Sequence, residues 1–167
     1  YYDVFLQRFD ANGQPLGAET SANTSSGFEN NAQYEPAITV LADGSFVVTW
    51  RSDGNSDGDG GYAGVFGQRF AADGSALGAE FQINTYTPYW QYEPSIAALA
   101  DGGFVVAWTS YYQDGGSTTG VFAQRYDADG NPVGDEFRVN TTTIDSEQQP
   151  SVAGLATLAL SPTLQAQ

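Results

Sequence analysis

The sequence predicts an all-β fold built from four-stranded antiparallel units that repeat along the chain. A 21-residue segment that begins at Val4 returns without a gap at Val65 and at Val121. A second block, QYEPAITVLADGSFVVTW from Gln33, returns from Gln91 as QYEPSIAALADGGFVVAW. No window has a helical apolar period over three turns. Repetition without helical periodicity therefore indicates tandem β units.

Each repeat holds four strand candidates, which are clearest in the last full copy. Ser95–Leu99 and Phe104–Trp108 are apolar and joined by Ala-Asp-Gly-Gly. Gly120–Tyr126 and Glu136–Asn140 follow, joined by a segment that contains Asp-Gly-Asn-Pro. Short Asp-Gly connections favour tight hairpins because glycine accepts a positive φ. Neighbouring strands are therefore expected to pair antiparallel.

The Phe-Val-Val runs at 46–48 and 104–106 are apolar on consecutive residues. Such a strand needs cover on both faces of its sheet, and blades that stack face to face provide it. We therefore expect a β-propeller-like arrangement of about three blades. A β-sandwich is the alternative.

The repeats divide the chain into a C-terminal half of a first blade (1–32), a second blade (33–85), a third blade (91–141) and a partial, diverged blade start or tail (149–167). The tail is expected to supply one strand at Ser151–Ala156 and a poorer one at Leu158–Ser161. Propellers usually close with about 4–8 blades, and open sheet edges pair with other chains. The expected partners are further copies in a homo-oligomer or neighbouring repeats of a longer chain.

Composition removes several classes of function. The 20 Asp and Glu residues against 5 Arg residues give a formal net charge of −15, which excludes nucleic acid and anionic membranes as partners. No apolar run is long enough to insert into a membrane. The chain has neither Cys nor His, so disulfides and Ser-His-Asp catalysis are absent.

The pattern VFxQR[FY]xAxG, followed by Gly-x-Glu and Asn-Thr and then by QYEP and LADGxFVVxW, resembles repeats of very large secreted bacterial proteins. Those repeats accompany haemolysin-type calcium-binding and adhesin modules. The resemblance covers about residues 4–156 and implies a secreted or cell-surface, propeller-like module. It implies no particular activity.

One loop has the opening of a calcium-binding pattern. Carboxylate and amide side chains alternate there with glycine, and can converge on one hard cation. The candidate ligands are Asp53, Asn55, Asp57 and Asp59. An EF-hand loop would end in Glu, where this chain has Gly64. A solvated Asp/Gly-rich loop is the alternative interpretation.

Other candidates recur at fixed repeat positions. Arg8, Arg69 and Arg125 each follow a Gln, and we expect them to pair with carboxylates that tie strands or adjacent blades. A repeated anion site is the alternative. Trp50 and Trp108 end the same strand in two repeats and are expected in the core between blades.

Tyr89, Trp90, Tyr111 and Tyr112 fall in segments that vary between repeats. Exposed aromatic faces beside polar groups can stack on sugar rings. Loop packing or a contact between chains is the alternative.

Together these observations predict a non-catalytic extracellular module that acts as a scaffold or adhesion surface. Calcium is the one cofactor that the sequence suggests. A carbohydrate-binding, lectin-like propeller is the first alternative, with a glycan as ligand. A fragment of a carbohydrate-active enzyme is the second.

Overall fold

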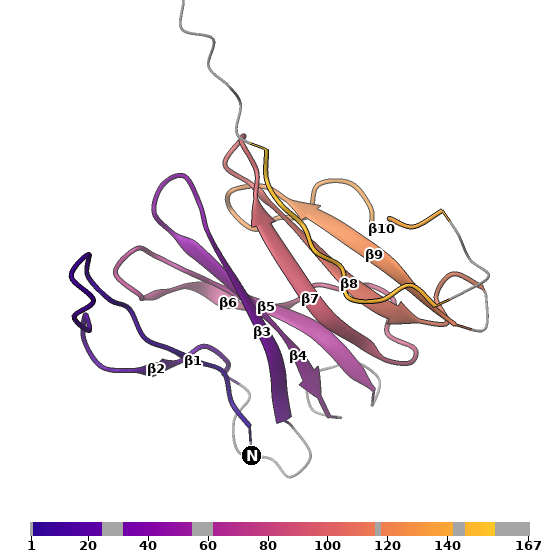
Figure 1. The fold of residues 1–167 in the computed structure, drawn as a ribbon, viewed down its shortest axis with the longest axis horizontal. Helices are drawn as coiled ribbons and strands as arrows, with labels where there is room; N and C mark the ends of the chain where they lie inside the picture. The colour runs from indigo at the N-terminus through magenta and orange to yellow at the C-terminus, as the bar shows by residue number, and fades with distance from the viewer. Residues whose placement is uncertain (1, 25–31, 55–61, 116–117, 142–145, 156–167) are drawn as a thin grey trace, which may run out of the picture.

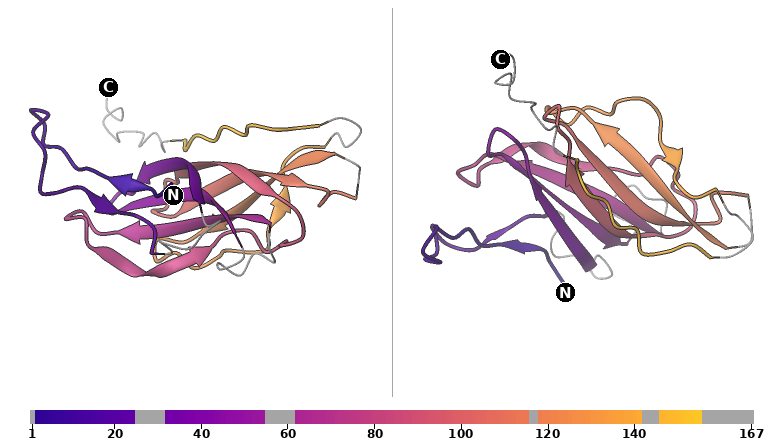
Figure 2. Two further views of the ribbon diagram at one scale, coloured as in Figure 1. Left: turned by 90° about the horizontal axis from the view of Figure 1, so that it is seen from below. Right: turned by 45° about the horizontal axis from the view of Figure 1, so that its top comes forward.

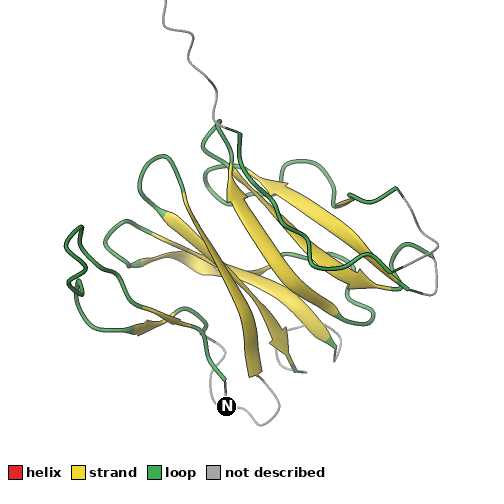
Figure 3. Ribbon diagram, viewed as in Figure 1, coloured by secondary structure: helices red, strands yellow, loops and turns green. Residues whose placement is uncertain are grey.

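The computed structural model describes residues 2–24, 32–54, 62–115, 118–141 and 146–155. Within them the chain is all-β and its sheets are antiparallel, as predicted (Figure 3). No helix in the described part of the chain is long and apolar enough to cross a membrane.

Each full repeat forms its own four-stranded sheet, with strands paired in chain order. The second repeat contains β3 (Ala32–Val40), β4 (Phe46–Asp53), β5 (Ala63–Phe70) and β6 (Ala76–Gln82). The third contains β7 (Gln91–Ala98), β8 (Phe104–Tyr111), β9 (Thr119–Tyr126) and β10 (Phe137–Arg138). The first segment contributes only β1 (Phe5–Leu6) and β2 (Thr20–Ser21), which pair with each other. No described sheet mixes strands from different repeats.

The three sheets follow one another across the molecule in chain order (Figures 1 and 2). The described residues form an open row and not a closed ring. Strand β7 packs against β3, β4 and β5, so the first strand of one repeat lies on the face of the repeat before it. The propeller geometry expected from the sequence is therefore not established by these residues.

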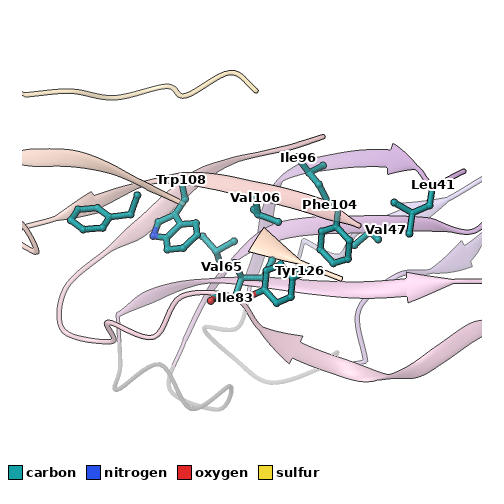
Figure 4. Packing of buried hydrophobic residues seen from close by; sticks show 10 residues of the cluster. Leu41, Val47, Val65, Ile83, Ile96, Phe104, Val106, Trp108 and Tyr126 are labelled. Atoms are coloured by element: carbon teal, nitrogen blue, oxygen red, sulfur yellow. Dashed lines mark hydrogen bonds between the residues drawn. The ribbon is translucent and has the colours of Figure 1, made fainter. Parts of the chain in front are cut away.

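The consecutive apolar residues of β4 are buried on both faces of its sheet. Val48 and Trp50 face the first segment, in a cluster with Val4. Val47 faces the other way, into a cluster with Phe104 and Trp108 of the third repeat (Figure 4). Alternate side chains of a strand point to opposite faces, so each inner strand serves two interfaces.

A β-bulge interrupts the pairing of the first two strands in both full repeats. The register shifts between Tyr34 and Ala37, and again between Tyr92 and Ser95. Glu35 and Glu93 lie within these bulges at φ of 55° and 56°. Residues other than glycine rarely adopt this left-handed conformation. The bulge also places the start of β7 at Gln91, four residues before the predicted start at Ser95.

The tail segment, defined as residues 146–155, contains no assigned strand, so the strand expected from Ser151 is not formed in its described part. Its backbone makes separate hydrogen bonds instead: the N–H of Glu147 donates to the carbonyl of Thr119 at 3.1 Å, and the N–H of Val152 donates to Ser95 Oγ at 3.1 Å. Val152 packs on Ala107, Val121 and Ala123, so the tail covers the far face of the third repeat. The poorer candidate at Leu158–Ser161 lies outside the described residues.

Candidate functional site

The aromatic residues singled out in the sequence lie together at the junction of the second and third repeats. The rings of Tyr111 and Tyr112 are 4.2 Å apart, and Tyr112 lies 5.0 Å from Tyr89 in an edge-to-face arrangement. Trp90 lies 6.0 Å from Tyr111. Tyr62, which the sequence analysis missed, lies 5.6 Å from Tyr89. These five residues are called the aromatic cluster below.

Backbone geometry holds the aromatic cluster in place. The N–H of Tyr111 donates to the carbonyl of Trp90 at 3.0 Å, which ties the segment before β7 to the end of β8. Tyr89 and Tyr112 have φ of 63° and 61°. Left-handed backbone at two non-glycine residues is a strained arrangement of the kind often found at binding sites. No pattern in the sequence singles out Tyr62, because it joins the cluster through the packing of two repeats.

A cavity of about 340 Å³ lies beside the cluster, lined by Arg51, Trp90, Tyr92 and Tyr111. The Trp90 side chain is 54% exposed. Burial, followed by the nearby Glu93 carboxylate, raises the pKa of Tyr92, so its phenol stays neutral near neutral pH. The site therefore offers flat apolar faces with neutral hydroxyls at their edges.

Arg51 closes one side of this cavity and is itself paired. Its Nε and Nη2 each lie 2.6 Å from an oxygen of the Asp53 carboxylate, the bidentate geometry that Arg favours. Partial burial acts to lower the pKa of Arg51, but hydrogen bonding to Asp53 and the charges of Asp53 and Glu35 outweigh it and raise the pKa.

This pair bears on the predicted calcium loop. Both oxygens of Asp53, its first candidate ligand, already accept hydrogen bonds from Arg51. Asn55, Asp57 and Asp59 lie outside the described residues. The described residues contain no group of three or more acidic side chains that could hold a metal ion.

The repeated arginines reach backbone carbonyls in the next repeat, where the sequence predicted carboxylates. Arg8 Nη1 donates to the carbonyl of Ala72 at 2.6 Å. Arg69 donates in the same way to the carbonyls of Ala128 and Asp129. Of these three repeated arginines, Arg125 alone pairs with a carboxylate among the described residues, that of Asp101 in its own repeat. The hairpin turns present free carbonyls, and the following repeat needed to continue the series is not among the described residues.

The repeated glutamates also join adjacent repeats. Glu80 Oε2 accepts hydrogen bonds from the backbone N–H and the hydroxyl of Thr24, at 2.8 and 2.9 Å. Glu136 Oε2 accepts the same two bonds from Thr85, at 2.7 and 2.9 Å. Each Thr belongs to the Asn-Thr pair that ends the 21-residue block, a recurrence that could have indicated this contact.

The glutamates of the bulges form a second series. Glu35 Oε2 accepts the backbone N–H of Glu93 at 2.7 Å, and Glu93 Oε2 accepts the N–H of Gln149 at 3.0 Å. Gln149 has the same left-handed backbone, with φ of 57°. The tail thus repeats the contact although it forms no strand.

Trp50 and Trp108 are fully buried in the two apolar clusters between repeats. Trp108 Nε1 also donates to Gln91 Oε1 at 3.1 Å, linking the first two strands of its sheet. Comparison with known proteins identifies no family model and no curated protein that matches the chain.

Proposed function

We propose that the chain is a non-catalytic extracellular repeat module, propeller-like in its stacking, which serves as a scaffold or adhesion surface. The observation that carries this proposal is the pair of equivalent contacts from Glu35 to the N–H of Glu93 and from Glu93 to the N–H of Gln149. Because the same kind of contact joins two successive pairs of segments, it could also join further repeats to the row.

The contacts between repeats are directional, which supports an array. The first segment offers the side chains of Arg8 and Thr24 to the second repeat. The second repeat offers those of Arg69, Thr85 and Glu35 to the third. In both junctions the later repeat supplies turn carbonyls and a glutamate carboxylate. An interface with two different faces generates open arrays or rings. We infer that further repeats, in the same chain or in another copy, continue this series.

The net charge is consistent with a module whose surface is exposed to solvent. A formal net charge of −15 on 167 residues favours solubility and opposes non-specific association. The proposal places the module in a secreted or cell-surface protein, in keeping with the sequence pattern.

Adding one repeat tests the stacking rule. Residues 93–148 would be duplicated in tandem, since Gln149 occupies the position of Glu93. Stability should then rise with repeat number, because each added interface contributes. We expect one cooperative urea transition with a higher midpoint and a larger m-value.

The matched control is the same duplication with Glu93→Ala and Glu136→Ala in the added repeat, which removes its two glutamate contacts. This control should gain less stability. An added repeat that unfolds in a separate transition, without raising the midpoint of the remainder, would contradict the proposal.

A second candidate function is carbohydrate binding at the aromatic cluster. Trp90 is exposed beside a cavity, whereas Trp50 and Trp108 are fully buried. Aromatic faces with a few polar groups are typical of sugar sites. A glycan array would identify candidate ligands, and isothermal titration calorimetry would then measure their binding.

The test variant is Trp90→Ala and the control is Phe137→Ala, which removes an equally exposed ring on β10. Binding that Trp90→Ala abolishes and Phe137→Ala preserves would support the site. An array without signal would remove this candidate.

A further inference from the structure

The two apolar interfaces of the molecule occupy equivalent positions but are not equally complete. The interface between the second and third repeats includes Leu41, from the turn between β3 and β4, and Val47, from β4. The interface between the first segment and the second repeat has no counterpart of either residue, because the described first segment contains only the equivalents of a third and a fourth strand.

Equivalent isoleucines in the first strands of the two full repeats differ in solvent exposure. Ile96 in β7 is 9% exposed, since the second repeat covers it. Ile38, at the same position of β3, is 57% exposed. A large aliphatic side chain that is buried in one repeat and bare in the next marks an uncovered binding face.

The aromatic rings at the ends of the third strands also indicate that the first segment lacks a partner strand. Phe70 stacks on Phe46 with centroids 5.1 Å apart, and Tyr126 stacks on Phe104 at 4.9 Å. Phe9 occupies the same repeat position but is 59% exposed, and no described ring stacks on it. Its expected partner is the Phe of a second strand.

A groove occupies the place of the missing strands. It has a volume of about 280 Å³ and an open edge along β1, whose only described partner is β2. Its large apolar side chains come from the first segment and from the exposed face of the second repeat: Leu6, Phe9, Leu16, Ile38, Val40 and Phe46.

We propose that this groove docks the first two strands of another repeat of the same kind. The ligand is an antiparallel hairpin with the pattern Gln-Tyr-Glu-Pro followed by Asp-Gly-x-Phe-Val-Val-x-Trp. Its second strand pairs with the open edge of β1, its Phe stacks on Phe9, and its first strand covers Ile38. This inference rests on the proposed stacking function and specifies the partner at one end of the row.

The hairpin can be supplied in the same chain. Residues 91–117 would be placed directly before Tyr1, because Thr118 occupies the position of Tyr1 in the repeat. Relative to the parent chain, the amides of β1 and β3 should become at least tenfold better protected from hydrogen exchange.

The control prefix carries serine in place of the residues copied from Leu99 and Val105, the counterparts of Leu41 and Val47. This removes the apolar side chains that face the second repeat but keeps the length. It should leave the protection of β1 and β3 unchanged. If the native prefix behaves like this control, the groove proposal is wrong.

Failure of the groove and failure of the stacking function can be told apart. Duplication of residues 93–148 tests stacking at the opposite end of the row, where the groove plays no part. If the duplication stabilises the chain and the prefix does not, stacking stands and the groove proposal alone is overturned. If neither stabilises it, both are wrong.

Discussion

The carboxylate of Glu35 accepts a hydrogen bond of 2.7 Å from the backbone N–H of Glu93, the residue that occupies its own position one repeat later. Both residues lie in β-bulges with left-handed backbone. A bulge leaves one residue out of the strand ladder, so its N–H is free to bond elsewhere. The local strain therefore produces the contact that joins the repeats.

The Thr–Glu contacts predict that glutamates at equivalent repeat positions differ in how much they stabilise the fold. Glu80→Ala should lower the free energy of unfolding by about 1 kcal/mol, because two hydrogen bonds from Thr24 to its charged carboxylate are lost. Urea unfolding would measure the loss. Glu19 occupies the same repeat position without a hydrogen bond in the described structure, so Glu19→Ala should change stability by no more than about 0.5 kcal/mol. Equal effects would remove the assigned role of Glu80.

Tyr126 predicts a dependence on alkaline pH. Burial, followed by the charge of Glu136, raises the pKa of its phenol well above the usual 10.0. An acid whose pKa is raised by folding stabilises the fold below its unfolded pKa, and this stabilisation is lost as the pH rises above it. Stability should therefore fall above about pH 10 in the wild type, and fall less in Tyr126→Phe.

At neutral pH, Tyr126→Phe should lower stability by about 1 kcal/mol, because the hydroxyl donates to the carbonyl of Ile83 in the adjacent repeat at 3.3 Å. The ring itself fits, since Phe70 has the same position. Tyr2→Phe at an exposed site is the control. A Tyr126→Phe variant with the alkaline sensitivity of the wild type would refute this assignment.

The hairpin turns predict acid sensitivity. The side chain and the backbone N–H of Asn131 donate to the Asp127 carboxylate and lower its pKa below 3.8. A depressed pKa contributes stability above the unfolded value, and this is lost as the pH falls through the folded value. The stability difference between wild type and Asp127→Ala, measured by urea unfolding, should shrink below about pH 4.

The matched control for the turn is Asp129→Ala. No hydrogen bond to the Asp129 carboxylate is seen in the described turn, so Asp129→Ala should change stability by no more than about 0.5 kcal/mol. A constant difference between wild type and Asp127→Ala down to pH 2.5 would contradict the role of the turn carboxylate.

Salt should stabilise the chain. Self-repulsion of a net charge of −15 is screened as ionic strength rises from about 0.02 to 0.2 M, so the urea midpoint should increase. Calcium and magnesium compared at equal ionic strength test the calcium loop that opens at Asp53. Equal effects indicate charge screening alone, and a larger gain with calcium indicates specific binding at the loop.

The sequence was sufficient to predict the repeats, the all-β class and the use of both faces of β4. Consecutive Phe46, Val47 and Val48 carry that information directly, because a strand with alternate faces must then bury both. The resemblance of the repeats to those of secreted bacterial proteins, and the function it implies, stay predictions.

Other features depend on contacts that no local pattern records. The partners of Arg8 and Arg69 are carbonyls about 60 residues away, and a carbonyl has no signature in the sequence. By contrast, the pairing of Arg51 with Asp53 could have been predicted, because residues two apart on a strand share a face. Tyr62 joined the aromatic cluster only through the stacking of two repeats.

Amide hydrogen exchange at Glu93 is the most direct test of stacking through the bulge glutamates. In the wild type the N–H of Glu93 should exchange slowly, and Glu35→Ala should accelerate it at least tenfold while leaving the N–H of Gln149 unchanged. Glu93→Ala should accelerate exchange of the Gln149 N–H by a smaller factor, because that N–H also donates to Thr109 Oγ1 at 3.2 Å. A Glu93 N–H that exchanges at the rate of an unprotected amide in the wild type would contradict the proposed linkage between repeats.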